Sequence, residues 1–257
     1  MNKPLILISN DDDITSKGIR TLIEVMAEIG EVVVVAPDTP QSGKGHAITL
    51  GSPLRLKKSD LFGTNIQAFD CNGTPADCVK IGKHLILKDR KPDLVVSGIN
   101  HGSNSTVSVL YSGTMSAAIE AAMEGLPAIG FSLCDYLPDA DFSHVRVYVK
   151  QIALQILANG LPKGVALNVN FPKISETPIQ GIKLVRQADA VYREQFDERI
   201  DPYGRPYYWM DGELENHQPE ATDTDEWALS NNFVSIVPCK YDLTDYQALD
   251  SLKSLIN

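Results

Sequence analysis

Short, uninterrupted apolar runs alternate with segments of helical periodicity through the first part of this 257-residue chain. The runs Pro4–Ser9 and Glu31–Pro37 lack polar alternation, which is typical of strands that helices cover on both faces. Between them, Lys17–Ile29 places apolar residues three, four and seven positions apart, and Gly30 provides a C-terminal stop. This alternation predicts an α/β fold: a three-layer, Rossmann-like, mostly parallel sheet flanked by helices.

The same patterns predict the remaining elements of this core. Thr74 is expected to cap a helix that begins at Pro75, with Asp77 at the third helical position. A hairpin is expected across residues 46–56. Further strands are predicted at residues 93–98, 126–132 and 166–172, and further helices at residues 114–124 and 144–159.

Beyond Pro172 the alternation stops, and the chain becomes polar, acidic and rich in aromatic residues. Two extended arms are predicted to turn at Asp201–Gly204, followed by a strand at 233–238 and a terminal helix at 246–256. An isolated two-stranded ribbon is marginally stable in water, so its aromatic residues, Tyr203 and Trp209 among them, are expected to contact a partner subunit rather than stack on a base. We therefore predict a core over residues 1–189 and an extension used in oligomerisation over residues 190–257.

Charge and composition narrow the possible partners. The formal net charge is −10, which argues against binding to a nucleic-acid duplex or to an anionic membrane surface. The apolar run Leu5–Ile8 is too short for a signal sequence or a membrane span. Cys71, Cys78, Cys134 and Cys239 show no metal-type spacing. The sequence therefore predicts a cytoplasmic protein with reduced cysteines.

Polar residues follow three of the predicted strands, where open parallel sheets bind their ligands. The first loop contains Asp11, Asp12 and Asp13, the second contains Ser42, and the third contains Asn100. Adjacent carboxylates repel each other, and keeping them together is costly unless a cation occupies the site. A set of ligands made only of oxygen atoms favours Mg²⁺ or Mn²⁺ over zinc. The alternative is that the three aspartates form a solvated turn that caps the following helix.

A fourth loop, Tyr111–Thr114, leads directly into a helix and offers free backbone N–H groups to an anion. Alone, such a segment is more often a simple helix cap. Together with an acidic cluster on the same sheet edge, it indicates a site for a phosphate ester bridged to a metal ion. The expected chemistry is hydrolysis by a metal-polarised water that Asp11 or Asp12 orients, with backbone donors at Gly113 and Thr114.

Five motifs carry a resemblance to a known family. SNDD (9–12), SG (42–43) followed by AITL (47–50), GTPADCV (73–79), VSGIN (96–100) and YSGT (111–114) occur in an order and spacing that resemble the SurE family of survival proteins, which are metal-dependent 5′-nucleotidases. The later segments NVNFP (168–172) and FVSIVP (233–238) also resemble that family. The resemblance implies hydrolysis of nucleoside 5′- and 3′-monophosphates, with short polyphosphate as a further substrate.

The resemblance also implies roles for particular residues. Asp11, Asp12, Ser42 and Asn100 would bind one divalent metal ion per subunit, and Asn104, Ser112, Gly113 and Thr114 would line the phosphate pocket. It further implies a homodimer with exchanged C-terminal segments, which in some members pairs into a tetramer. One position departs from the family pattern, because Asp13 stands where Gly is usual. Asp tolerates a positive φ at a cost.

Two rival functions remain open at this stage. Read as D11-x-D13, the first loop resembles haloacid-dehalogenase phosphatases, with Asp11 as nucleophile and Asp13 as acid/base. A non-catalytic nucleotide-binding module is the second rival. His46 and His101 lie near the site in sequence, and each is either structural or a general acid for the leaving alkoxide.

Overall fold

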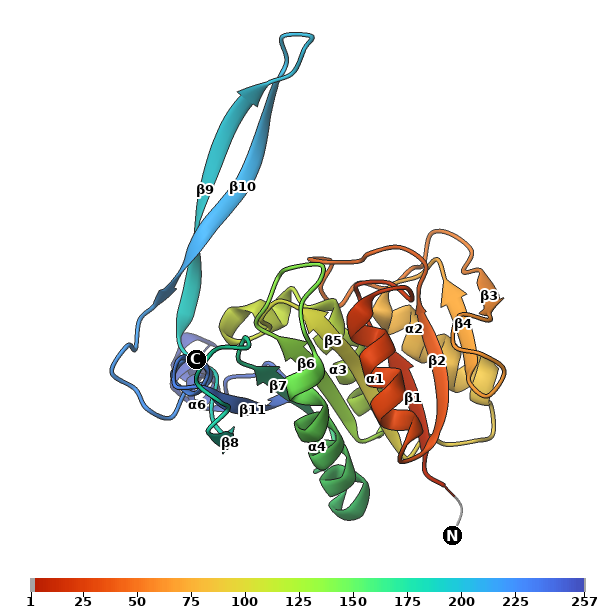
Figure 1. Cartoon of the computed structure of the whole chain (residues 1–257). Helices are drawn as coiled ribbons and strands as arrows, with labels where there is room; N and C mark the ends of the chain where they lie inside the picture. The colour runs from red at the N-terminus through yellow and green to blue at the C-terminus, as the bar shows by residue number, and fades with distance from the viewer. Residues whose placement is uncertain (1–2, 257) are drawn as a thin grey trace.

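The computed structural model describes residues 3–256, and its centre is a nine-stranded sheet (Figure 1). The strand order is β3-β4-β2-β1-β5-β6-β7-β11-β8. The run from β4 to β7 is parallel, whereas β3 and β11 pair antiparallel with β4 and β7. The strands of this sheet are β1 (Leu5–Ser9), β2 (Glu31–Pro37), β3 (Leu56–Ser59), β4 (Gln67–Cys71), β5 (Leu94–His101), β6 (Ala128–Leu133), β7 (Val165–Phe171), β8 (Gly181–Leu184) and β11 (Phe233–Lys240).

Helices cover both faces of the sheet and produce the predicted three layers. Helices α1 and α4 pack together on one face, and α2 and α3 pack together on the other. The alternation within β1 explains the two cores: Ile6 and Ile8 point into one apolar cluster, and Leu5 and Leu7 into the other. The helices are α1 (Lys17–Ala27), α2 (Pro75–Ile81), α3 (Gly113–Met123), α4 (Arg146–Asn159), α5 (Asp225–Ser230) and α6 (Tyr246–Ser251), with shorter turns η1 (Gly82–Leu87), η2 (Thr106–Leu110), η3 (Ser143–Val145) and η4 (Leu252–Ile256).

The predicted start of α2 is confirmed in detail. Thr74 Oγ1 accepts a hydrogen bond from the backbone N–H of Asp77 at 3.2 Å, and the Asp77 carboxylate accepts one from the backbone N–H of Thr74 at 3.0 Å. This reciprocal capping box satisfies two of the donors that the first turn leaves unpaired. The cap also fixes the loop after β4, so the carboxyl edge of the sheet is rigid on this side.

The hairpin expected across residues 46–56 is wrong, because this segment hydrogen-bonds to the α2 cap instead of to itself. The backbone N–H of Thr49 donates to the Asp77 carboxylate at 3.1 Å, and Thr74 Oγ1 donates to the carbonyl of Ala47 at 2.7 Å. The antiparallel pair forms later, between β3 and β4. Strand β8 and helix α5 are further elements that the pattern did not predict.

The predicted two-armed extension is present and projects away from the sheet (Figure 1). Strands β9 (Ala190–Ile200) and β10 (Pro206–Asn216) pair antiparallel along their whole length and turn at Asp201–Gly204. After this hairpin the chain returns to the body, where β11 joins the central sheet between β7 and β8. No side chain of α6 is buried. The hairpin and the terminal helix therefore leave apolar side chains exposed.

Candidate functional site

Four loops meet at the carboxyl edge of the sheet, as the sequence predicts for a doubly wound fold. Asp11 and Asp12 follow β1, and the Ser42 loop follows β2. The backbone N–H of Gln41 donates to the carbonyl of Asp11 at 2.8 Å, which joins these two loops directly. Helix α3 begins against the same edge at Gly113.

Asp11 is buried against the first turn of α3. Thr114 Oγ1 donates to Asp11 Oδ1 at 2.5 Å. Gly113 makes this approach possible, because a Cβ at that position would lie 2.5 Å from the Cβ of Asp11. Burial raises the pKa of Asp11 above its ordinary value, although the Thr114 hydroxyl and the nearby backbone N–H groups of α3 oppose the rise. The start of α3 therefore stabilises a carboxylate that burial disfavours.

Asp12 lies beside Asp11 and is held by the third loop. The backbone N–H of His101 donates to Asp12 Oδ2 at 3.1 Å. Burial, together with repulsion from Asp11 and Asp13, raises the pKa of Asp12 to about 7. Within residues 3–256, neither Asp11 nor Asp12 forms an ion pair with a Lys, Arg or His side chain. The buried carboxylate of Asp11 and the half-buried carboxylate of Asp12 thus lack a compensating charge from the described residues.

Asp13 differs from its two neighbours in both backbone and side chain. Its φ is 88°, in the region that glycine adopts most easily. Its carboxylate accepts hydrogen bonds from the backbone N–H and the hydroxyl of Thr15, both at 2.6 Å. The third aspartate therefore braces the turn before α1. Among the described residues, no three or more His, Cys, Asp or Glu side chains are grouped so that they could hold a metal ion.

Ser42 and Asn100 complete the set of residues expected to bind metal. Ser42 is exposed, one residue from the Gln41 contact with Asp11. Asn100 follows an irregularity between β5 and β6, and its Nδ2 donates to the carbonyl of Gly102 at 2.8 Å. That hydrogen bond orients the amide, and no residue of 3–256 donates to its Oδ1. A hydroxyl and a free amide oxygen therefore accompany the carboxylates at this edge.

Asn104, expected in the phosphate pocket, is held by a network of buried amides. Its Nδ2 donates to Ser132 Oγ at 2.8 Å, and its backbone N–H donates to Asn170 Oδ1 at 2.8 Å. Asn168 Nδ2 donates to the carbonyl of Asn104 at 2.8 Å, and Asn170 Nδ2 donates to Asn168 Oδ1 at 2.9 Å. In the sequence, Asn168 and Asn170 belong to a predicted strand and to the segment NVNFP, and no site role was predicted for them. Two amides inside an otherwise apolar run were the signal that they hold a neighbouring loop.

Ser112 caps α3, since its Oγ accepts a hydrogen bond from the backbone N–H of Met115 at 3.0 Å. The Ser112 hydroxyl proton is then free to donate to another acceptor. The structure thus brings Ser112, Gly113 and Thr114 together at one helix start beside Asp11. Gly113 and Thr114 already face the carboxylate of Asp11 in the absence of a ligand.

The two histidines considered as general acids have protein partners. His46 Nε2 lies 2.9 Å from Glu120 Oε2, and Lys80 Nζ lies 2.5 Å from Glu120 Oε1. His101 Nδ1 lies 2.9 Å from the carbonyl of Leu137, and its ring contacts Phe142 edge to face. Each ring therefore has one nitrogen engaged in fixing a loop, and neither ring hydrogen-bonds to Asp11 or Asp12 within residues 3–256.

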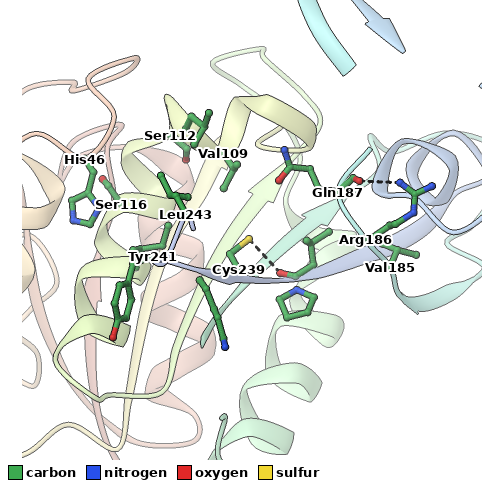
Figure 2. A pocket seen from close by; sticks show the side chains of 15 residues that line it. His46, Val109, Ser112, Ser116, Val185, Arg186, Gln187, Cys239, Tyr241 and Leu243 are labelled. Carbon is green, nitrogen blue, oxygen red and sulfur yellow. Dashed lines mark hydrogen bonds between the residues drawn. The ribbon is translucent and has the colours of Figure 1, made fainter. Parts of the chain in front are cut away.

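A cavity of about 480 Å³ is lined in part by Ser112 (Figure 2). Figure 2 shows His46, Ser112 and Ser116 on one side of it and Val185 and Arg186 on the other. Its lining is mostly apolar and includes Val109, Val237 and Leu243, but neither carboxylate. This cavity adjoins the start of α3 without containing the acidic pair.

The donor set at the sheet edge fits a hard divalent cation. All of its candidate ligand atoms are oxygens. They belong to the carboxylates of buried Asp11 and half-buried Asp12, which have no cationic partner within residues 3–256, to the Ser42 hydroxyl, and to an Asn100 amide oxygen that accepts from no described residue. Mg²⁺ and Mn²⁺ prefer such ligands. The fold and the site define the class of the protein: an α/β protein whose sheet edge presents paired carboxylates beside a helix N-terminus.

Comparisons with known proteins identify the family within this class. The family model described as "Survival protein SurE" matches residues 6–194. The chain is 68% identical over 252 residues to "5'-nucleotidase SurE" from Cytophaga hutchinsonii, covering 98% of this chain and 96% of that protein. It is 56% identical over 254 residues to the protein of the same name from Flavobacterium psychrophilum, covering 99% and 98% of the two chains. The chain belongs to the SurE family.

A solved structure supports the same assignment. The fold matches the "Crystal Structure of Sure Protein from Aquifex aeolicus" with a TM-score of 0.84 and 40% sequence identity, covering 99% of this chain and 100% of that one. The match extends over the hairpin and the C-terminal residues as well as the core. The resemblance inferred from five short motifs is therefore confirmed over the whole chain.

Proposed function

We propose that this protein is a 5′-nucleotidase, which hydrolyses nucleoside monophosphates to a nucleoside and phosphate. The observation that carries the proposal is a pair of carboxylates beside the start of α3, a buried Asp11 and a half-buried Asp12, with no compensating protein cation within residues 3–256. Relatives at 68% and 56% identity that carry the name 5′-nucleotidase support it. Nucleoside 3′-monophosphates and short polyphosphate are further proposed substrates.

The proposed cofactor is one divalent metal ion per subunit, Mg²⁺ or Mn²⁺, held by Asp11, Asp12, Ser42 and Asn100. When bound, such an ion neutralises phosphoryl oxygens and increases the acidity of a coordinated water. The raised pKa of Asp12 supports this assignment, because a site that disfavours two negative charges favours any cation that joins them. The Gly102 carbonyl keeps the Asn100 amide nitrogen turned aside, which presents the amide oxygen.

The chain's own residues would position the substrate and the attacking water. The Ser112 hydroxyl and the backbone N–H groups at Gly113 and Thr114 would donate to phosphate oxygens, at the positive end of the α3 dipole. Asn104 would line the same pocket, with its loop held by Asn168 and Asn170. Asp11 or Asp12 would accept a hydrogen bond from the water and orient it for attack on phosphorus.

The test is a panel of metals and substrates. Phosphate release is measured from AMP, 3′-AMP, p-nitrophenyl phosphate and tripolyphosphate, with Mg²⁺, with Mn²⁺ and with chelator. We expect metal-dependent release that is largest for a nucleoside monophosphate. Equal release with chelator would refute the metal assignment, and metal-dependent binding of AMP without release would favour the non-catalytic module.

The haloacid-dehalogenase rival requires Asp13 to act as acid/base. The Asp13 carboxylate instead accepts two hydrogen bonds from Thr15, so it braces a turn. That geometry favours water attack without a covalent intermediate. Rapid quenching with labelled AMP checks this point, and a phosphoaspartate at Asp11 would reinstate the rival.

The proposed assembly is a homodimer, with a tetramer as a further association and with the C-terminal segments exchanged. Exposed apolar side chains on the hairpin and the tail support it, namely Phe196, Ile200, Tyr203, Trp209, Leu243 and Leu249. The proposed location is the cytoplasm, supported by four cysteines that form no disulfide. Among residues 3–256, none of the helices is long and apolar enough to cross a membrane.

A further inference from the structure

Asp225, the first residue of α5, is a fully buried carboxylate that lies outside the sequence motifs for metal and phosphate. Its Oδ1 accepts hydrogen bonds from the backbone N–H groups of Ala188 at 2.8 Å and Glu226 at 3.0 Å, and its Oδ2 accepts one from the backbone N–H of Thr106 at 2.8 Å. Within residues 3–256 it forms no ion pair with a Lys, Arg or His side chain. Three backbone donors therefore satisfy this buried group, and both of its oxygens are used.

The contact with Thr106 fixes a strained point of the chain. Thr106 has a φ of 52°, in the left-handed region that β-branched residues rarely adopt. The residue is 1% exposed, and its hydroxyl has no hydrogen-bond partner among the described residues. A backbone conformation of this kind costs free energy and persists only where surrounding contacts hold it. The hydrogen bond from the Thr106 N–H to Asp225 is such a contact.

The strained residue belongs to the loop of the proposed phosphate pocket, since Asn104 lies two positions before it. Between them, Ser105 Oγ donates to Glu226 Oε1 at 2.7 Å. The loop is thus held from two directions, because α5 contacts Ser105 and Thr106 while the amides of β7 hold Asn104.

The side chain of Asn104 keeps a donor for a ligand in this arrangement. An amide nitrogen carries two N–H groups, and Asn104 Nδ2 donates one of them to Ser132 Oγ at 2.8 Å. The other has no acceptor among the described residues, so it can donate to a phosphate oxygen. Its direction depends on the conformation of residues 104–106.

Asp225 also joins this loop to the root of the β9–β10 hairpin. Ala188, which donates to Asp225, lies two residues before β9. The backbone N–H of Asp225 donates to the carbonyl of Arg186 at 3.0 Å, and that of Arg186 donates to the carbonyl of Asp223 at 3.0 Å. The segments before and after the hairpin therefore meet at the residue that fixes the loop, and this frame gives the carboxylate a defined place.

From these contacts we infer that Asp225, together with Glu226, positions the phosphate pocket by holding residues 104–106 in the conformation in which the Asn104 amide can donate to a phosphate oxygen. Both are positioning residues that act through the loop. The role rests on the proposed function, in which Asn104 lines the phosphate pocket.

Asp225→Asn tests this role, because it keeps the shape of the side chain and replaces one acceptor oxygen with an amino group that faces a backbone N–H. Titration with inorganic phosphate in the presence of Mn²⁺ is expected to show an affinity about tenfold or more below that of wild type. Titration with Mn²⁺ alone should stay within about threefold of wild type, because the substitution lies outside the proposed ligand set. A general loss of structure lowers both affinities, whereas lost positioning lowers only the affinity for phosphate.

Asp223→Asn is the matched control, since it removes the same charge two residues earlier. Asp223 is exposed and pairs with Arg186 at the surface, so the affinities for phosphate and Mn²⁺ should both stay within about twofold of wild type.

Ser105→Ala is the second variant, and it leaves Asp225 in place. It removes the hydroxyl that donates to Glu226, so the affinity for phosphate should fall about threefold while that for Mn²⁺ is kept. Thermal unfolding checks that each variant folds, and Ser105→Ala decides the matter if Asp225→Asn does not.

Unchanged phosphate affinity in Asp225→Asn or in Ser105→Ala would overturn the positioning role. An equal loss of phosphate and Mn²⁺ affinity in Asp225→Asn would also overturn it, because Asp225 would then support the fold alone. No phosphate binding by the metal-loaded wild type would remove the pocket and the role together. Phosphate binding without release of phosphate from AMP would instead refute the proposed function, and the titrations would still decide the role of Asp225.

Discussion

At the scale of single residues, Asp12 links metal binding to protonation. Its folded-state pKa of about 7 lies above the ordinary value of 3.8 because of burial and neighbouring carboxylates. Without metal, the proton on Asp12 therefore stabilises the fold fully below pH 3.8, and this contribution is lost as the pH rises through about 7. A cation that occupies the site must displace that proton.

We therefore predict that metal affinity increases with pH. Displacing one proton with a pKa near 7 makes binding about tenfold tighter at pH 8 than at pH 6. Titration of the metal-free protein with Mn²⁺ at both pH values measures this ratio, and buffers of different ionisation enthalpy report the released proton. Asp12→Asn is expected to bind weakly at both pH values. Equal affinity of the wild type at pH 6 and pH 8 would contradict the account.

Asp13 carries a separate prediction, because it occupies a backbone conformation suited to glycine. At φ 88° a Cβ is strained, and the Asp13 side chain offsets part of that strain by accepting two hydrogen bonds from Thr15. Asp13→Ala keeps the Cβ and loses the hydrogen bonds, so it should be about 1 kcal/mol less stable than Asp13→Gly. Urea unfolding of the two variants measures the difference. A more stable Asp13→Ala would show that the turn relaxes around the side chain.

At the scale of elements, the site depends on the contact between the start of α3 and Asp11. Gly113 lets the helix approach Asp11, and a Cβ there would lie 2.5 Å from the Asp11 Cβ. We expect Gly113→Ala to push α3 away from β1, destabilise the fold by about 1–3 kcal/mol and reduce kcat/KM about 100-fold. Thermal unfolding and phosphate release measure the two effects.

Gly51→Ala is the control for that substitution. A Cβ at Gly51 meets no atom within 4 Å, so stability and activity should remain near those of wild type. Full activity in Gly113→Ala would mean that the close approach of α3 to Asp11 has no part in the chemistry.

Local patterns predicted most elements because each depends on nearby residues. A few adjacent residues determine the cap at Thr74, the buried runs of β1 and β2, and the turn at Asp201. The hairpin predicted for residues 46–56 was wrong, because the hydrogen-bond partners of this segment are Asp77 and Thr74, which are distant in sequence. The composition of residues 46–56 is typical of a turn, whereas their backbone groups pair with a helix cap formed elsewhere in the sequence.

The site was also only partly predictable, because it depends on contacts between residues that are distant in sequence. Paired aspartates after a strand indicated a cation, but their different roles depend on φ at Asp13 and on the contact between Asp11 and Thr114. The network that supports Asn104 joins the loop after β5 to Ser132 in β6 and to Asn168 and Asn170 in β7. Such contacts follow from tertiary packing, and sequence spacing does not reveal them.

At the scale of the whole molecule, the hairpin and the tail expose apolar surface that the sheet does not cover. Strands β9 and β10 contact each other along their length and project from the body (Figure 1). Ile200 is 69% exposed and Trp209 is 60% exposed. Exposed apolar surface of this kind marks an interaction site.

Deleting residues 193–210 should therefore change the oligomeric state. We expect the shortened chain to form particles with fewer subunits than the full chain, as calculated from the mass measured by light scattering. Thermal unfolding checks that its core remains folded, since β11 still joins the sheet. An unchanged number of subunits per particle would show that the hairpin is not the interface.

In the proposed mechanism Asp12 acts with a metal ion on a phosphate ester, while its neighbour Asp13 only braces a turn. Phosphate release from AMP with Mn²⁺ by Asp12→Asn and Asp13→Asn tests this pair most directly, because both substitutions remove one charge from the same loop. We predict that Asp12→Asn loses about 1,000-fold or more in kcat/KM and that Asp13→Asn stays within about tenfold of wild type. An active Asp12→Asn beside an inactive Asp13→Asn would contradict the account.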